Sequence, residues 1–150
     1  MNDCLIIGVG NPQRGDDGVG LAAARLVRAA LPEADVRESS GDPADLIELW
    51  TTARVPTVYV IDAMVSGGAP GSVTRFDAHR HPMPVAMNGT STHKFGVAAA
   101  VELARVLDCL PNQLFVYGIE GGQFDHAERL SPEVEAAARE VAQLICADPR

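Results

Sequence analysis

The sequence predicts an α/β domain built as a three-layer α/β/α sandwich. Short, continuous apolar segments alternate with longer segments whose apolar residues recur at helical spacing. The chain has 150 residues, a length that fits a single domain spanning residues 1–150. The turn Gly67-Gly68-Ala69-Pro70-Gly71 is too short for the crossover that joins two parallel strands, so we expect a mixed sheet with one antiparallel strand.

The expected strands are apolar or rich in β-branched residues and cover residues 4–9, 35–38, 55–61, 72–76 and 113–117. The expected helices cover residues 16–30, 42–52, 92–107 and 131–146. Asp42 and Ser131 occupy expected cap positions, and each precedes a proline, which is favoured at the first helical position. The residues of the first helix expected to face the sheet are Val19, Ala22, Ala23, Leu26, Val27 and Ala30.

Charge, cysteine content and apolar segments indicate which classes of protein the sequence does not fit. The formal net charge of -8 argues against nucleic-acid binding, which needs a basic face. The three cysteines are scattered and form no CxxC pair, as is typical of reduced thiols in a cytoplasmic protein. The N-terminus lacks the features of a signal peptide. No apolar stretch approaches the roughly 18 residues of a membrane span, so we expect no membrane insertion.

Three segments each place one potential metal ligand after a predicted strand. Asp17 lies in the glycine-rich segment 8–20, Asp62 ends the strand before Ala63, and His93 starts a predicted helix. Ligands in open α/β sheets gather at the carboxyl ends of strands, so these side chains are expected to lie together. Two carboxylates and an imidazole suit nickel, zinc, iron or manganese better than magnesium or calcium.

Each candidate also has a simpler structural interpretation. One carboxylate is enough to cap the first helix, so we assign Asp16 to the cap and Asp17 to function. Asp62 could instead cap a neighbouring backbone turn. A helix N-terminus keeps the imidazole of His93 neutral and able to bind a metal. The other three histidines lie in polar, loop-like segments and are expected at the surface: His79, His81 and His126.

Other functional classes fit less well. A GxGxxG dinucleotide turn would need glycine where Gln13 stands, and the adjacent carboxylates would repel a pyrophosphate. HExxH and GxSxG motifs are absent from the sequence, so a peptidase would rest on metal or carboxylate chemistry. A receiver-like signalling domain, with Asp16 and Asp17 as a magnesium pocket and Asp62 phosphorylated, is the alternative. It would need a lysine after the last strand, where Gly118-Ile119-Glu120 stands.

Taken together, these segments resemble the hydrogenase maturation proteases, the endopeptidases that process the large subunit of nickel-iron hydrogenases. The resemblance covers most of the chain and rests on the combined order of several short motifs. They are Gly-x-Gly-Asn-x-x-x-x-Asp-Asp-x-x-Gly from Gly8 to Gly20, Asp62-Ala63 with Val65-Ser66, Pro70-Gly71, Ser91-Thr92-His93 with Gly96, and Gly118-Ile119-Glu120 with Leu130-Ser131-Pro132.

The resemblance implies a five-stranded mixed sheet of order 2-1-3-5-4 with the fourth strand antiparallel, of the phosphorylase/hydrolase-like type. It implies that Asp17, Asp62 and His93 contact nickel and carry the catalytic function. The implied partner is the nickel-loaded precursor of the hydrogenase large subunit, which brings the nickel and loses a short C-terminal extension. We also expect residues 77–91 to line the substrate cleft. Two departures from the family pattern are Ser39-Ser40-Gly41-Asp42, in place of a Gly-Gly pair, and Gly121, in place of proline.

Overall fold

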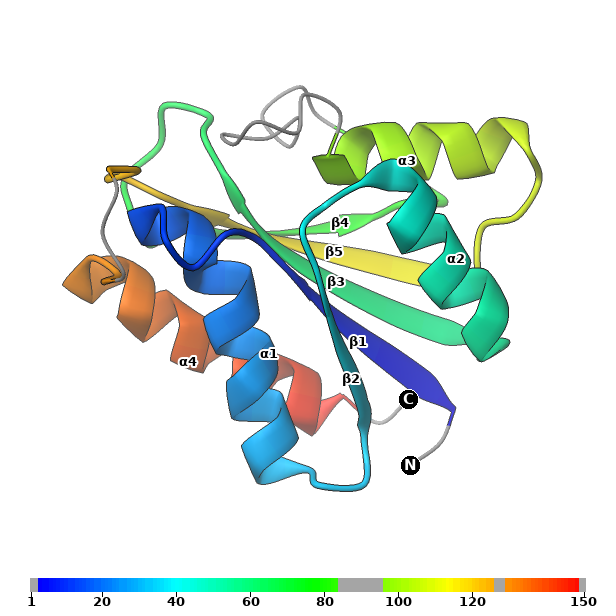
Figure 1. Ribbon diagram of the computed structural model, residues 1–150, viewed down its shortest axis with the longest axis horizontal. Helices are drawn as coiled ribbons and strands as arrows, with labels where there is room; N and C mark the ends of the chain where they lie inside the picture. Colours follow the sequence, from blue (N-terminus) through cyan, green and yellow to red (C-terminus); the bar gives the residue numbers. More distant parts are fainter. Residues whose placement is uncertain (1–2, 84–95, 126–128, 149–150) are drawn as a thin grey trace.

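Five strands form one mixed sheet with two helices on each face (Figure 1). The computed structural model describes residues 3–83, 96–125 and 129–148. The strands are β1 (Cys4–Val9), β2 (Asp35–Ser39), β3 (Thr57–Met64), β4 (Val73–Asp77) and β5 (Gln113–Glu120). The helices are α1 (Val19–Ala30), α2 (Pro43–Ala53), α3 (Gly96–Val106) and α4 (Pro132–Ala147), with a short 3-10 helix, η1 (Gly15–Gly18), before α1.

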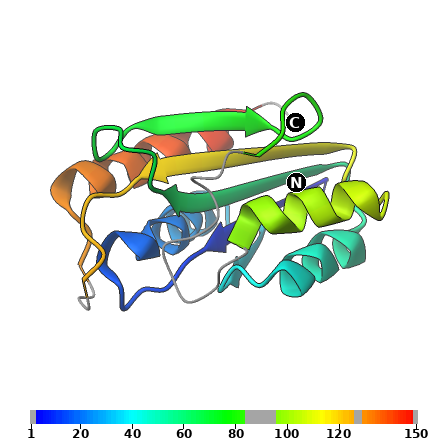
Figure 2. The same ribbon diagram turned by 90° about the horizontal axis from the view of Figure 1, so that it is seen from above.

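The strand order is β2-β1-β3-β5-β4, and β4 pairs antiparallel with β5 while the other neighbours are parallel. Figure 2 shows β4 at one edge of the sheet, beside β5. This topology confirms the predicted fold class, including the antiparallel strand that the short turn at 67–71 required. Both β3 and β5 run further than predicted, to Met64 and Glu120.

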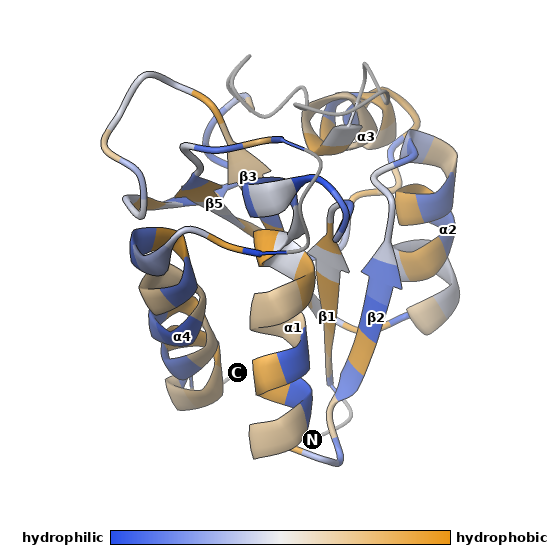
Figure 3. Ribbon diagram, turned by 60° about the vertical axis from the view of Figure 1, so that its left-hand side comes forward, coloured by the Kyte–Doolittle hydropathy of each residue, from blue (hydrophilic) through white to orange (hydrophobic). Residues whose placement is uncertain are grey.

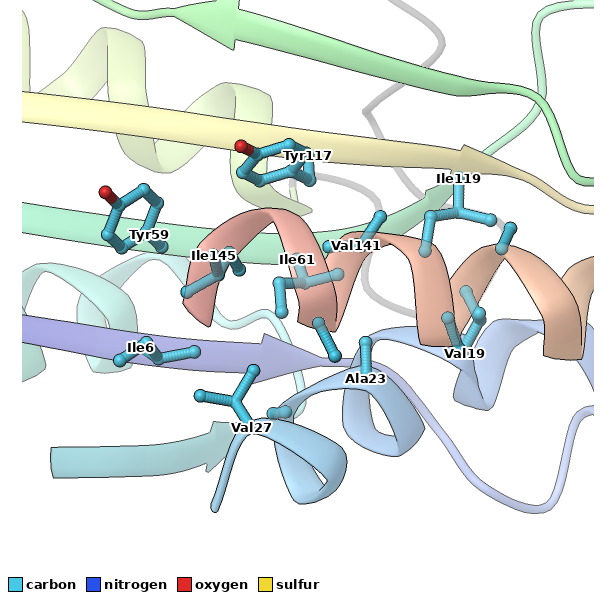
Figure 4. Packing of buried hydrophobic residues seen from close by; sticks show 14 of the residues in the cluster. Ile6, Val19, Ala23, Val27, Tyr59, Ile61, Tyr117, Ile119, Val141 and Ile145 are labelled. Carbon is cyan, nitrogen blue, oxygen red and sulfur yellow. The ribbon is translucent and has the colours of Figure 1, made fainter. Parts of the chain in front are cut away.

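Alternate residues of the central strands face opposite helix layers, as the period of two in a strand requires. Ile6, Tyr59 and Ile61 pack against α1 and α4 (Figure 4), whereas Leu5, Ile7 and Val60 pack against α2 and α3. Figure 3 shows β1 largely apolar and the edge strand β2 mixed in hydropathy. Two separate cores therefore hold the central strands rigidly from both sides.

The orientation of α1 differs in part from the prediction. Val19, Ala23 and Val27 are buried as expected, but Leu26 and Ala30 are exposed, and Leu21 and Ala24 are buried instead. The reason is a close contact: a Cβ built on Gly8 would lie 2.6 Å from the Cβ of Ala24. The small residues of α1 therefore turn toward β1.

The remaining helices agree better with the prediction. Asp42 caps α2 by accepting a hydrogen bond from the Asp45 N–H. The expected inward face of α3 is fully buried: Val97, Ala100, Val101 and Ala104. Within residues 3–83, 96–125 and 129–148, no helix is both long and apolar enough to cross a bilayer.

Candidate active site

Asp62 lies inside β3, where it pairs with Gly118 of β5, and not at the end of the strand as predicted. Successive residues of a strand face opposite sides of the sheet. The Asp62 side chain therefore faces away from the side of Ile61 and Ala63 and toward the side of Val60 and Met64, which α2 and α3 cover. The residue is only 5% exposed. Its Oδ1 accepts a hydrogen bond of 2.8 Å from the Ala63 N–H.

Asp17 reaches the same region from η1 and is 4% exposed. Its Oδ2 accepts a hydrogen bond of 3.1 Å from the Asn11 N–H, which closes the loop between β1 and η1. Gly20 makes this approach possible, because a Cβ there would lie 2.2 Å from the Ile61 carbonyl oxygen and 2.3 Å from that of Val9. The start of α1 is thus pressed against the carboxyl ends of β1 and β3, next to Asp62.

The two carboxylates interact electrostatically. Burial raises the pKa of Asp62 well above its ordinary value, and the nearby charge of Asp17 raises it further. The Ala63 hydrogen bond opposes this rise but is the smaller effect. A buried pair of like charges favours either a shared proton or a bound cation. The pair therefore fits the chemistry of a divalent metal ion.

The third predicted ligand, His93, lies outside the described residues. Among the residues that are described, no group of three His, Cys, Asp or Glu side chains could hold a metal ion. The chain enters α3 at the same edge of the sheet, three residues after His93: a Cβ on Gly41, beside Val9, would lie 4.0 Å from the Gly96 Cα. His79 and His81 are exposed, as predicted, and His126 also lies outside the described residues.

Asp16 is a structural residue, but the prediction that it caps the first helix is wrong. Neither η1 nor α1 has a side-chain cap. The fully buried Asp16 carboxylate instead accepts hydrogen bonds from the Gly122 and Gln123 N–H groups at 2.8 and 2.9 Å. It also accepts from the Ser131 N–H at 2.7 Å and the Ser131 hydroxyl at 2.8 Å. Asp16 thus joins the segment that carries Asp17 to the connection between β5 and α4.

Glu120 is a fourth buried carboxylate, which the sequence analysis named only as part of a motif. It is 2% exposed at the end of β5. Its carboxylate accepts hydrogen bonds from both the N–H and the hydroxyl of Ser66, in the connection between β3 and β4. The available signal was a glutamate at the end of an otherwise apolar strand, but its partner 54 residues away could not be read from sequence.

The sequence of the chain matches a known family. The sequence model of the HycI hydrogenase maturation protease family matches residues 8–148. The chain belongs to the hydrogenase maturation protease family. It is therefore a hydrogenase maturation endopeptidase, a hydrolase of peptide bonds.

Individual members of the family are distant relatives. The hydrogenase expression/formation protein HupD of Thiocapsa roseopersicina is 24% identical over 152 residues, covering 95% of this chain and 69% of that protein. The hydrogenase-maturating endopeptidase HybD of E. coli superposes with a TM-score of 0.74 at 24% identity, covering 95% of this chain and 88% of the other. HybD of Thermococcus kodakarensis gives a TM-score of 0.71 at 23% identity, covering 95% of both chains. These structures share the fold.

Family membership excludes the receiver-like alternative. A receiver-like domain has the strand order 2-1-3-4-5, whereas the maturation protease has 2-1-3-5-4 with an antiparallel β4.

The structure also accommodates both departures from the family pattern. At Gly121, a Cβ would lie 2.4 Å from the Phe124 ring, so Phe124 fills the space that a side chain would need. At the end of β2, the buried Ser39 hydroxyl donates to Asp45 at 2.8 Å and accepts from the Gly41 N–H at 3.0 Å. Each departure has its own local packing and leaves Asp17 and Asp62 in place.

Proposed function

We propose that this maturation protease removes a C-terminal extension from the nickel-loaded precursor of a nickel-iron hydrogenase large subunit. Asp17, Asp62 and His93 contact the nickel that the precursor carries. The observation that supports this most strongly is the buried pair of Asp17 and Asp62 at the carboxyl edge of the sheet. Such a pair is costly without a cation and is relieved when a divalent ion arrives.

The nickel is part of the substrate in this proposal. Two carboxylates and an imidazole leave coordination positions open for ligands that the precursor supplies. Held there, nickel has two available roles: it polarises the scissile carbonyl or activates water, or it serves as a handle that positions the bond. Both roles place the scissile bond next to Asp62.

We expect the purified protein to cleave the nickel-loaded precursor and to leave the nickel-free precursor intact. Mass spectrometry of the products would give the length of the removed peptide and the bond that is cut. Equal cleavage of both precursors would contradict nickel recognition while leaving the endopeptidase activity in place.

We also expect the isolated protein to contain less than one metal ion per chain and to fold without it. The open ligand set binds free ions weakly, and the two apolar cores provide the folding energy. Metal analysis and thermal unfolding with and without a chelator would test this. Tightly bound zinc at one ion per chain, with unfolding of the protein when the zinc is removed, would indicate a structural site instead.

The expected cleft wall at residues 77–91 is only partly described. His81 and Pro82 are exposed, and the Met83 N–H donates to Glu102 on α3 at 3.3 Å. Residues 84–91 lie outside the described residues. We propose that this segment lines the substrate cleft.

A further inference from the structure

The connection between β3 and β4 borders the candidate active site. It begins at Val65, three residues after Asp62, and three extended residues span about 10 Å. Residues 65–70 are all exposed and include no charged side chain, in a chain whose net charge is -8. Val65 is 47% exposed, which is unusual for a valine at the end of a buried strand. The connection therefore presents an exposed, uncharged surface that begins about 10 Å along the chain from Asp62.

Glu120 holds this connection in place through both its side chain and its backbone. The Ser66 N–H donates to Oε2 at 2.8 Å, and the Ser66 hydroxyl donates to Oε1. The Gly71 N–H donates to the Glu120 carbonyl oxygen at 2.8 Å, and the Glu120 N–H donates to the Ser72 carbonyl oxygen at 2.8 Å. One residue of β5 thus holds both ends of the connection.

A carboxylate is a costly side chain at this buried position. No Lys or Arg within the described parts of the chain forms a salt bridge with Glu120. A buried carboxylate without a cation costs more than an apolar side chain of similar size. In return, it holds Ser66 by two directed hydrogen bonds, which an apolar contact cannot do. The connection also packs against the neighbouring segment, because a Cβ on Gly122 would lie 2.7 Å from the Pro70 ring.

We propose that residues 65–70 form the surface that holds the precursor polypeptide beside the scissile bond, and that Glu120 is the residue that positions this surface. The inference rests on the proposed function. This surface fits an uncharged stretch of the precursor, one apolar side chain of which covers Val65. Glu120 acts through Ser66 and does not contact the substrate.

The test is steady-state cleavage of the nickel-loaded precursor by the full-length protein. Val65→Ser removes the exposed apolar contact and should raise KM roughly tenfold, with kcat within about twofold of the wild type. Glu120→Ala should raise KM to a similar degree. Glu120→Gln should restore it, because its carbonyl accepts from the Ser66 N–H and its amide group donates to the Ser66 hydroxyl oxygen.

Val106→Ser is the matched control, because Val106 is 83% exposed at the far end of α3. It should leave KM unchanged. A wild-type KM for Val65→Ser, or an equal rise for Val106→Ser, would overturn the inference even if Glu120→Ala fails to fold. So would a fall in kcat at constant KM. If the wild-type protein itself does not cleave the precursor, the proposed function fails, and the inference fails with it.

Discussion

Replacing Asp62 with asparagine is expected to abolish precursor cleavage and to stabilise the metal-free protein. Cleavage should fall by more than about 100-fold, because the proposed nickel contact of this carboxylate is lost. The free energy of unfolding at pH 7 should rise by on the order of 1–3 kcal/mol, because a buried charge next to Asp17 is removed. Asparagine keeps the acceptor for the Ala63 N–H, so the backbone contact survives.

The direction of the Asp62 pKa shift determines how the stability difference between the variant and the wild type changes with pH. The folded state raises the pKa of Asp62, so its favourable contribution to stability is full below the ordinary value of 3.8 and is lost as pH rises through the raised pKa. The difference in stability between Asp62→Asn and the wild type should therefore grow with pH over that window. Denaturant unfolding of the metal-free proteins at several pH values would measure it.

Asp108→Asn provides a matched control, because Asp108 is exposed and asparagine tolerates its left-handed backbone. It should change neither cleavage nor the pH profile. Normal cleavage by Asp62→Asn would remove Asp62 from the site. A pH profile identical to that of the wild type would show that the charge is not buried in solution.

Replacing Asp16 with alanine should cause the largest loss of stability, about 3–5 kcal/mol. The substitution leaves three part-buried backbone N–H groups and one hydroxyl without their acceptor. Asp16→Asn should not rescue it, because the asparagine amide group would face N–H donors. Denaturant unfolding with a fitted m-value would measure the change.

Ser131→Ala is the natural comparison, because it removes only the hydroxyl donor to Asp16 and should cost about 1 kcal/mol. In the double variant the two losses should not add, since both residues belong to one network. A loss below about 1 kcal/mol for Asp16→Ala would show that these hydrogen bonds contribute little in solution.

The sequence by itself determined much of this fold. Continuous apolar segments identified the strands, and the short glycine-rich turn at 67–71 required one antiparallel strand. The sequence also predicted that Asp17 and Asp62 lie close together, because parallel strands end at the same edge of the sheet, and the charge of Asp17 does act on Asp62. These features depend on periodicity and chain direction, which are local properties of a sequence.

Only the tertiary structure decided how the carboxylates are used. Asp16 finds its partners 106 to 115 residues away, and Glu120 finds Ser66 54 residues away. The sequence correctly treated Asp16 as structural but named the wrong partner, since a cap is the only local partner it offers. The face of α1 was likewise set by the contact of Ala24 with Gly8. Such choices depend on which distant segments meet, and side-chain periodicity carries no information about that.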